Sequence, residues 1–145
     1  YVFFGWGLAL ALSSVFVAPR LTQSFGLMPV ICTILVGFAV LLVGLGFGVD
    51  NLTLLIVLVI VAGIFIGIFN TVLTEAVMEA TELPRNVASS TYSGLRFLGG
   101  AIAPAVSGPL ATAYGAGVPY WAGAATLVVS LVILFAGRST LTRIL

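Results

Sequence analysis

Five apolar stretches occupy most of this chain, and they constrain its fold more than any other feature. They cover residues 1–18, 28–49, 52–80, 87–113 and 120–137. A helix of about 20 apolar residues crosses the ~30 Å hydrocarbon core of a bilayer. Continuous apolar runs such as 54–69 do not alternate with polar residues as the strands of a membrane barrel do. The sequence therefore predicts an all-α membrane protein with five transmembrane helices.

Composition excludes a soluble domain and most enzyme classes. The chain is 61% hydrophobic and 6% charged, with a mean hydropathy of +1.31, whereas soluble proteins carry about 25% charged residues. A net charge of +1 leaves no basic surface for nucleic acid. The chain has no histidine and a single cysteine, Cys32, so it lacks the side chains of common zinc sites and of a serine–histidine pair. We expect neither an enzyme nor a bound metal or cofactor.

Positive charge predicts the topology. All five basic residues are arginines, and a chain that starts outside places Arg20, Arg85 and Arg138 at cytoplasmic helix ends, with Arg143 in a cytoplasmic tail. The outer connections carry no positive charge, as the positive-inside rule requires. Residues 19–27 are predicted to form the first cytoplasmic loop. Because the chain opens within an apolar stretch, without an initiator methionine or a charged leader, we expect earlier helices to precede it.

Polar residues are concentrated in the first, third and fourth stretches. Polar groups in hydrocarbon need protein partners or a watery cavity, so these three helices are predicted to line an interior, whereas the second and fifth can face lipid. The candidate cavity residues are Ser13, Asn70, Thr74 and Tyr92. For Asn70, near mid-membrane, a helix–helix hydrogen bond and a place in a substrate cavity are equally compatible with the sequence.

Charged residues form a constellation at the end of the third stretch and within the fourth. Glu75, Glu79 and Glu82 follow helical spacing on one stripe, and Arg96 lies at a similar depth on the next helix. Three interpretations stay open. The carboxylates can form a solvated helix end; Arg96 can make a structural ion pair with Glu75 or Glu79; or Glu75 can be a protonatable coupling group, with Arg96 its gating partner.

Small residues recur at four-residue spacing on two helices. Gly63 and Gly67 form one such pair, and Gly100, Pro104 and Gly108 follow one face of the fourth stretch. Close helix packing is one interpretation. Hinging is the other, because proline removes a backbone donor and can bend a helix.

The runs GIFNTVLTEAVMEAT at 67–81 and ASSTYSGLRFLGGAIAP at 88–104 resemble bacterial multidrug efflux permeases of the major facilitator superfamily, in its twelve-helix drug:proton antiporter branch. The resemblance covers essentially the whole chain and implies that its stretches are helices eight to twelve. It further implies a multi-pass protein of the bacterial inner membrane that exports small organic molecules in exchange for protons, by alternating access, together with a missing N-terminal half. The loop at 19–27 departs from the superfamily, because it lacks the acidic and basic residues of the usual loop signature.

A second function remains compatible with the sequence. A membrane scaffold or assembly subunit that does not transport would use the glycine-rich faces to hold a partner. Transport by the full-length protein distinguishes this alternative from an exporter.

Overall fold

The computed structural model describes residues 1–82 and 84–137, and the regular structure there is helical throughout. The elements in chain order are α1 (Val2–Leu12), a π-helical turn η1 (Ser13–Val17), α2 (Ala18–Phe25), α3 (Leu27–Phe47), α4 (Leu52–Glu79), α5 (Arg85–Tyr114) and α6 (Val118–Ala136). Among the described residues, four helices are long and apolar enough to cross a membrane: Val2–Phe25, Leu27–Phe47, Leu52–Glu79 and Val118–Ala136. The prediction of an all-α membrane protein is confirmed.

The first candidate span, called the first crossing below, covers Val2–Phe25, and its helix continues beyond the apolar stretch predicted at residues 1–18. α1, η1 and α2 follow one another without a break, so the predicted loop at 19–27 is wrong. Pro19, which has no N–H, lies at the start of α2 directly after the π-helical turn. The chain reverses at Gly26 alone, whose φ of 81° is a conformation that side chains disfavour.

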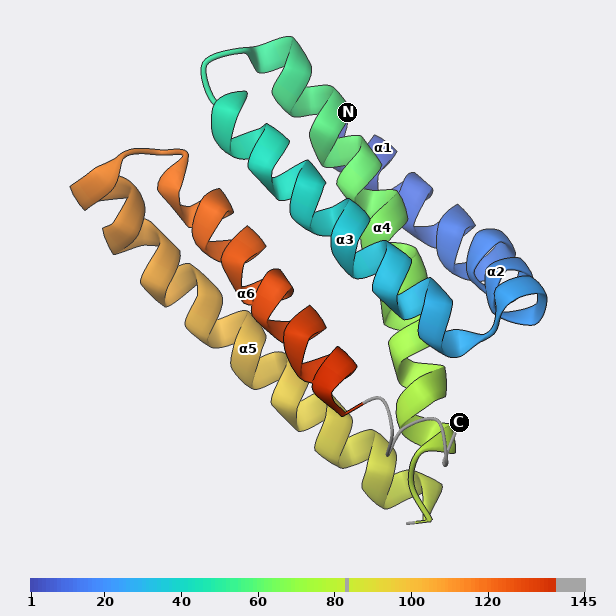
Figure 1. Cartoon of the computed structure of the whole chain (residues 1–145). Coiled ribbons are helices and arrows are strands. Elements are labelled where there is room, and N and C mark those ends of the chain that lie inside the picture. The colour runs from blue at the N-terminus through green and yellow to red at the C-terminus, as the bar shows by residue number, and fades with distance from the viewer. Residues whose placement is uncertain (83, 138–145) are drawn as a thin grey trace.

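The helices pack in a row, and α3 lies near its middle (Figure 1). α1 packs on α4, α4 on α3, and α3 on α6, with α5 on the other side of α6. The apolar α3 therefore buries much of its surface against other helices, although the sequence placed the second stretch among those that can face lipid. Lipid tails and leucine side chains are equally apolar, so hydropathy does not distinguish the two environments.

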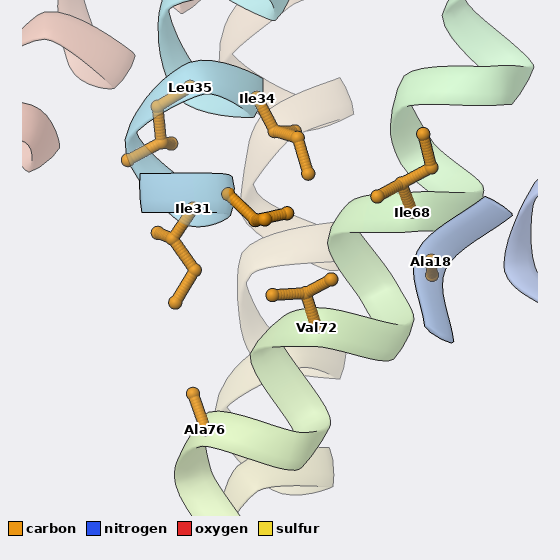
Figure 2. Close-up of a cluster of buried hydrophobic side chains, with 8 residues drawn as sticks. Ala18, Ile31, Ile34, Leu35, Ile68, Val72 and Ala76 are labelled. Atoms are coloured by element: carbon orange, nitrogen blue, oxygen red, sulfur yellow. The ribbon is translucent and has the colours of Figure 1, made fainter. Parts of the chain in front are cut away.

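The main core joins the two central helices to the first crossing (Figure 2). Val72 of α4 and Ala18 of α2 are completely buried, at 0% exposure. The α3 side chains of this cluster lie across from the α4 side chains. The cluster's buried members are Ala18, Val30, Ile31, Ile34, Leu35, Ile68, Val72 and Ala76. It fixes the C-terminal half of α4, the part that carries the carboxylates.

α5 is the longest of the described helices, and most of its 30 residues are exposed. Of these, Ala88 alone is buried within the described chain. The helix is long enough to cross a membrane but is not among the helices that are also apolar enough, because Arg96 and the polar residues before it, and the Gly, Pro, Ser and Thr residues after it, lower its hydropathy. A crossing at 87–113 therefore stays a prediction.

Candidate functional site

Asn70 and Thr74 occupy successive turns of α4, both half-buried. The Thr74 hydroxyl donates to the Asn70 backbone carbonyl oxygen at 2.6 Å, so its proton is used within the helix. The Asn70 side-chain amide makes no hydrogen bond to the described residues. It lies about 13 Å along the helix axis from the end at Glu79, at ~1.5 Å per residue. An amide at that depth is available to a ligand, to water or to another helix.

Glu75 and Glu79 lie one turn apart on α4, and both are exposed. The neighbouring stripe, formed by Val72 and Ala76, packs into the core against α3. This end of α4 is thus packed against α3 on one side, while Glu75 and Glu79 lie outside that contact. Exposed carboxylates within a membrane-crossing helix require either water or a protein partner.

Arg96 is exposed on α5, one turn after the half-buried Tyr92. Within the described residues it forms no ion pair with Glu75 or Glu79. The structure therefore does not join the predicted pair, and the pairing stays a prediction.

Ser13 lies in a helix contact. It is 2% exposed, and its hydroxyl donates to the Leu10 carbonyl oxygen at 3.0 Å. A Cβ added at Gly67 would meet this hydroxyl and the same carbonyl oxygen, and one added at Gly63 would lie 2.5 Å from the carbonyl oxygen of Trp6. Gly63 and Gly67 thus allow α4 to approach the first crossing closely, and Ser13 belongs to that packing.

The small residues of α5 do not lie in a close helix contact within the described chain. A Cβ added at Gly100 or Gly108 would find nothing within 4 Å in the described chain. Pro104, between them, is exposed and does not interrupt the helix. This face of α5 is open.

A hollow of about 480 Å³ lies between α5 and α6, lined in part by Pro104 and Pro119. The hydroxyls that border it, Ser107 and Thr126, each donate to a carbonyl of their own helix. The hollow consequently offers few polar groups to a ligand. Among the described residues, no group of three His, Cys, Asp or Glu side chains is placed to hold a metal ion.

The chain is 42% identical over 144 residues to the multidrug efflux protein YfmO of Bacillus subtilis (strain 168). The matched region is 99% of this chain and 36% of that protein, so the chain spans about a third of the relative's length. No family model matches the sequence. No solved structure matches it either. The similarity to YfmO extends over the whole of the helical framework described above.

Sequence reasoning missed one polar contact between the first crossing and α4. The hydroxyls of Ser14 and Thr71 lie 2.7 Å apart, at the π-helical turn. The sequence carries no signal for this contact, because it depends on the register between two helices that are far apart in the chain.

Proposed function

We propose that this chain is part of a secondary active transporter of the major facilitator superfamily that exports small organic compounds. The observation that carries the proposal is its 42% identity, over 99% of its length, to a protein named for multidrug efflux. Export proceeds in exchange for protons, by alternating access about a site near the membrane midplane. The protein resides in the bacterial inner membrane.

In this proposal the substrate meets the half-buried polar residues of α4 and α5. Asn70 supplies an unengaged amide, Thr74 a hydroxyl oxygen, and Tyr92 an aromatic ring with a polar tip. Apolar surroundings with a few polar groups suit amphipathic organic molecules.

Glu75, with Glu79 beside it, is the coupling group. Its exposure on a membrane-crossing helix supports this role, because an ionised carboxylate there needs water or a cation, whereas a protonated one tolerates burial. Arg96 is the gating cation, pairing with a carboxylate in one of the two access states. Protonation of Glu75 then releases the pair and permits the transition.

The rest of the polypeptide completes the pathway. The relative is about three times as long as the matched region, and the open face of α5 supports a contact with helices outside this chain. The N-terminus lies outside and the C-terminus in the cytoplasm, with Arg20 and Arg85 on the cytoplasmic side. Arg138 and Arg143, which agree with this topology in the sequence, lie outside the described residues.

The test uses the full-length protein reconstituted in liposomes, with a fluorescent lipophilic cation as substrate and an imposed pH gradient. We expect gradient-driven transport, and we expect Glu75→Gln to reduce it about 100-fold, since the amide cannot take up and release a proton as a carboxyl group does. Glu82→Gln, an equal change at an exposed position beyond the end of α4, is the matched control and retains transport.

Normal coupled transport by Glu75→Gln contradicts the coupling role. No flux from a folded wild-type protein contradicts the transporter and favours the membrane scaffold.

A further inference from the structure

The π-helical turn η1 leaves one backbone carbonyl without its usual donor. In a regular α-helix the carbonyl of Ser14 accepts from the N–H of Ala18. Here the Ala18 N–H donates to the carbonyl of Ser13. The next backbone nitrogen along the chain is that of Pro19, which carries no hydrogen and cannot donate to the Ser14 carbonyl.

Thr71 of α4 reaches this carbonyl from the neighbouring helix. Its Oγ1 lies 3.5 Å from the Ser14 carbonyl oxygen and 2.7 Å from the Ser14 hydroxyl. It also lies 3.1 Å from the carbonyl oxygen of Gly67, on its own helix. A hydroxyl has one proton, so Thr71 donates either to its own helix or across to the turn.

The two halves of the first crossing are anchored differently. α1 is held against α4 at Gly63 and Gly67, where backbone atoms approach closely. α2 is held through Ala18 in the core cluster with α3 and α4. Beside the turn, Ser13 and Val17 border a hollow of about 360 Å³. Movement at the turn therefore has room and breaks a side-chain hydrogen bond, while the regular hydrogen bonds of α1 and α2 stay intact.

We propose that η1 is a hinge of the first crossing and that the Ser14–Thr71 pair is its latch. With the latch closed, Thr71 supplies the missing donor to the Ser14 carbonyl. With the latch open, Thr71 bonds to Gly67 and α2 tilts relative to α1. π-Helical turns recur at functional sites, and Thr71 directly follows Asn70, so the hinge moves at the depth of the proposed substrate site. This inference rests on the proposed function for its role in transport, and on the contacts alone for the hinge.

The experiment uses the full-length protein in a background free of other cysteines, with Cys32→Ala. Spin labels at Phe3→Cys and Gln23→Cys, both exposed, report the distance across the turn. We expect two distance populations. Pro19→Ala restores the backbone N–H at position 19, so this segment can form a regular α-helix without the π-helical turn. We therefore expect a single distance population in this variant.

Thr71→Val removes the latch while keeping the side-chain shape. We expect it to change the ratio of the two populations about tenfold, as loss of a partner for a partly buried carbonyl does, and to slow export by a similar factor. Thr71→Ser keeps the hydroxyl and restores the ratio. Thr33→Val is the matched control, because Thr33 bonds to the Pro29 carbonyl of its own helix, at 2.8 Å, and should change nothing.

A single population in the wild-type protein, unaltered by Pro19→Ala and Thr71→Val, overturns the hinge. If the wild-type protein exports nothing, the proposed function fails, while two populations that merge in Pro19→Ala still support the hinge.

Discussion

At the scale of single residues, Gly67 is a position at which α4 comes within backbone contact of the first crossing. A side chain there would meet both the Ser13 hydroxyl and the carbonyl oxygen of Leu10. A serine hydroxyl can rotate away, but a helical carbonyl cannot move without its helix. The glycine is therefore required by the packing.

Gly67→Ala should destabilise the full-length protein, because the added methyl group forces the two helices apart. Overpacking of this kind costs about 1–3 kcal/mol, and thermal unfolding in detergent measures it. Gly44→Ala is the control, since its Cβ would lie 3.7 Å from Leu58, an ordinary contact distance. Equal unfolding temperatures for the two variants would show that α4 and the first crossing are not closely packed.

At the scale of elements, the pair formed by α3 and α6 depends on small residues at matching heights. The indole of Trp121 occupies the space that a side chain at Gly46 would need, and a Cβ at Gly117 would lie 2.6 Å from the carbonyl oxygen of Gly46. Further along the pair, Ala124 is 6% exposed, whereas the adjacent Ala125 is exposed. Of these two neighbouring alanines, Ala124 thus faces the contact with α3, and Ala125 faces the outside of the described helices.

Ala124→Leu should destabilise the protein by about 1–3 kcal/mol, because the larger side chain enters the contact between α3 and α6. Ala125→Leu makes the same change on the outer face and should leave stability unaltered. Unfolding by a denaturing detergent compares them. Equal loss in both variants would place a second contact on the outer face of α6.

The elements themselves were largely predictable, and their partners were not. Apolar runs of membrane-spanning length located α3, α4 and α6, because a continuous apolar segment satisfies its own backbone hydrogen bonds within lipid by forming a helix. The sequence predicted that the first helix ends at Ala18, since Pro19 and the polar residues after it resemble a loop. In the structure the π-helical turn η1 precedes Pro19, and the helix continues through α2. The place of α3 between α4 and α6 was missed because its side chains suit lipid and helices equally. The hydroxyl pair of Ser14 and Thr71 depends on a helix register that sequence does not specify.

At the scale of the whole molecule, the described helices leave α5 the least covered. Leu95 and Phe97 are 65% and 77% exposed, and beside them Gly99 and Gly100 have open space where a side chain would lie. Elsewhere in the chain, at Gly63 and Gly67, glycines mark close helix contacts. The open glycines of α5 therefore favour a contact with the rest of the longer protein proposed above.

Gly100→Leu tests this assembly directly. Within the described chain the added side chain meets no atom within 4 Å of its Cβ, so it should have no effect if α5 faces lipid. If other helices of the full-length protein pack there, the same substitution separates them and lowers both thermal stability and export, the latter by about tenfold or more. Ala125→Leu, on the exposed side of α6, controls for added bulk at another exposed position. A Gly100→Leu protein as stable and active as the wild type would mean that lipid covers this face, and the gating role of Arg96 would then lack the protein surroundings that it needs.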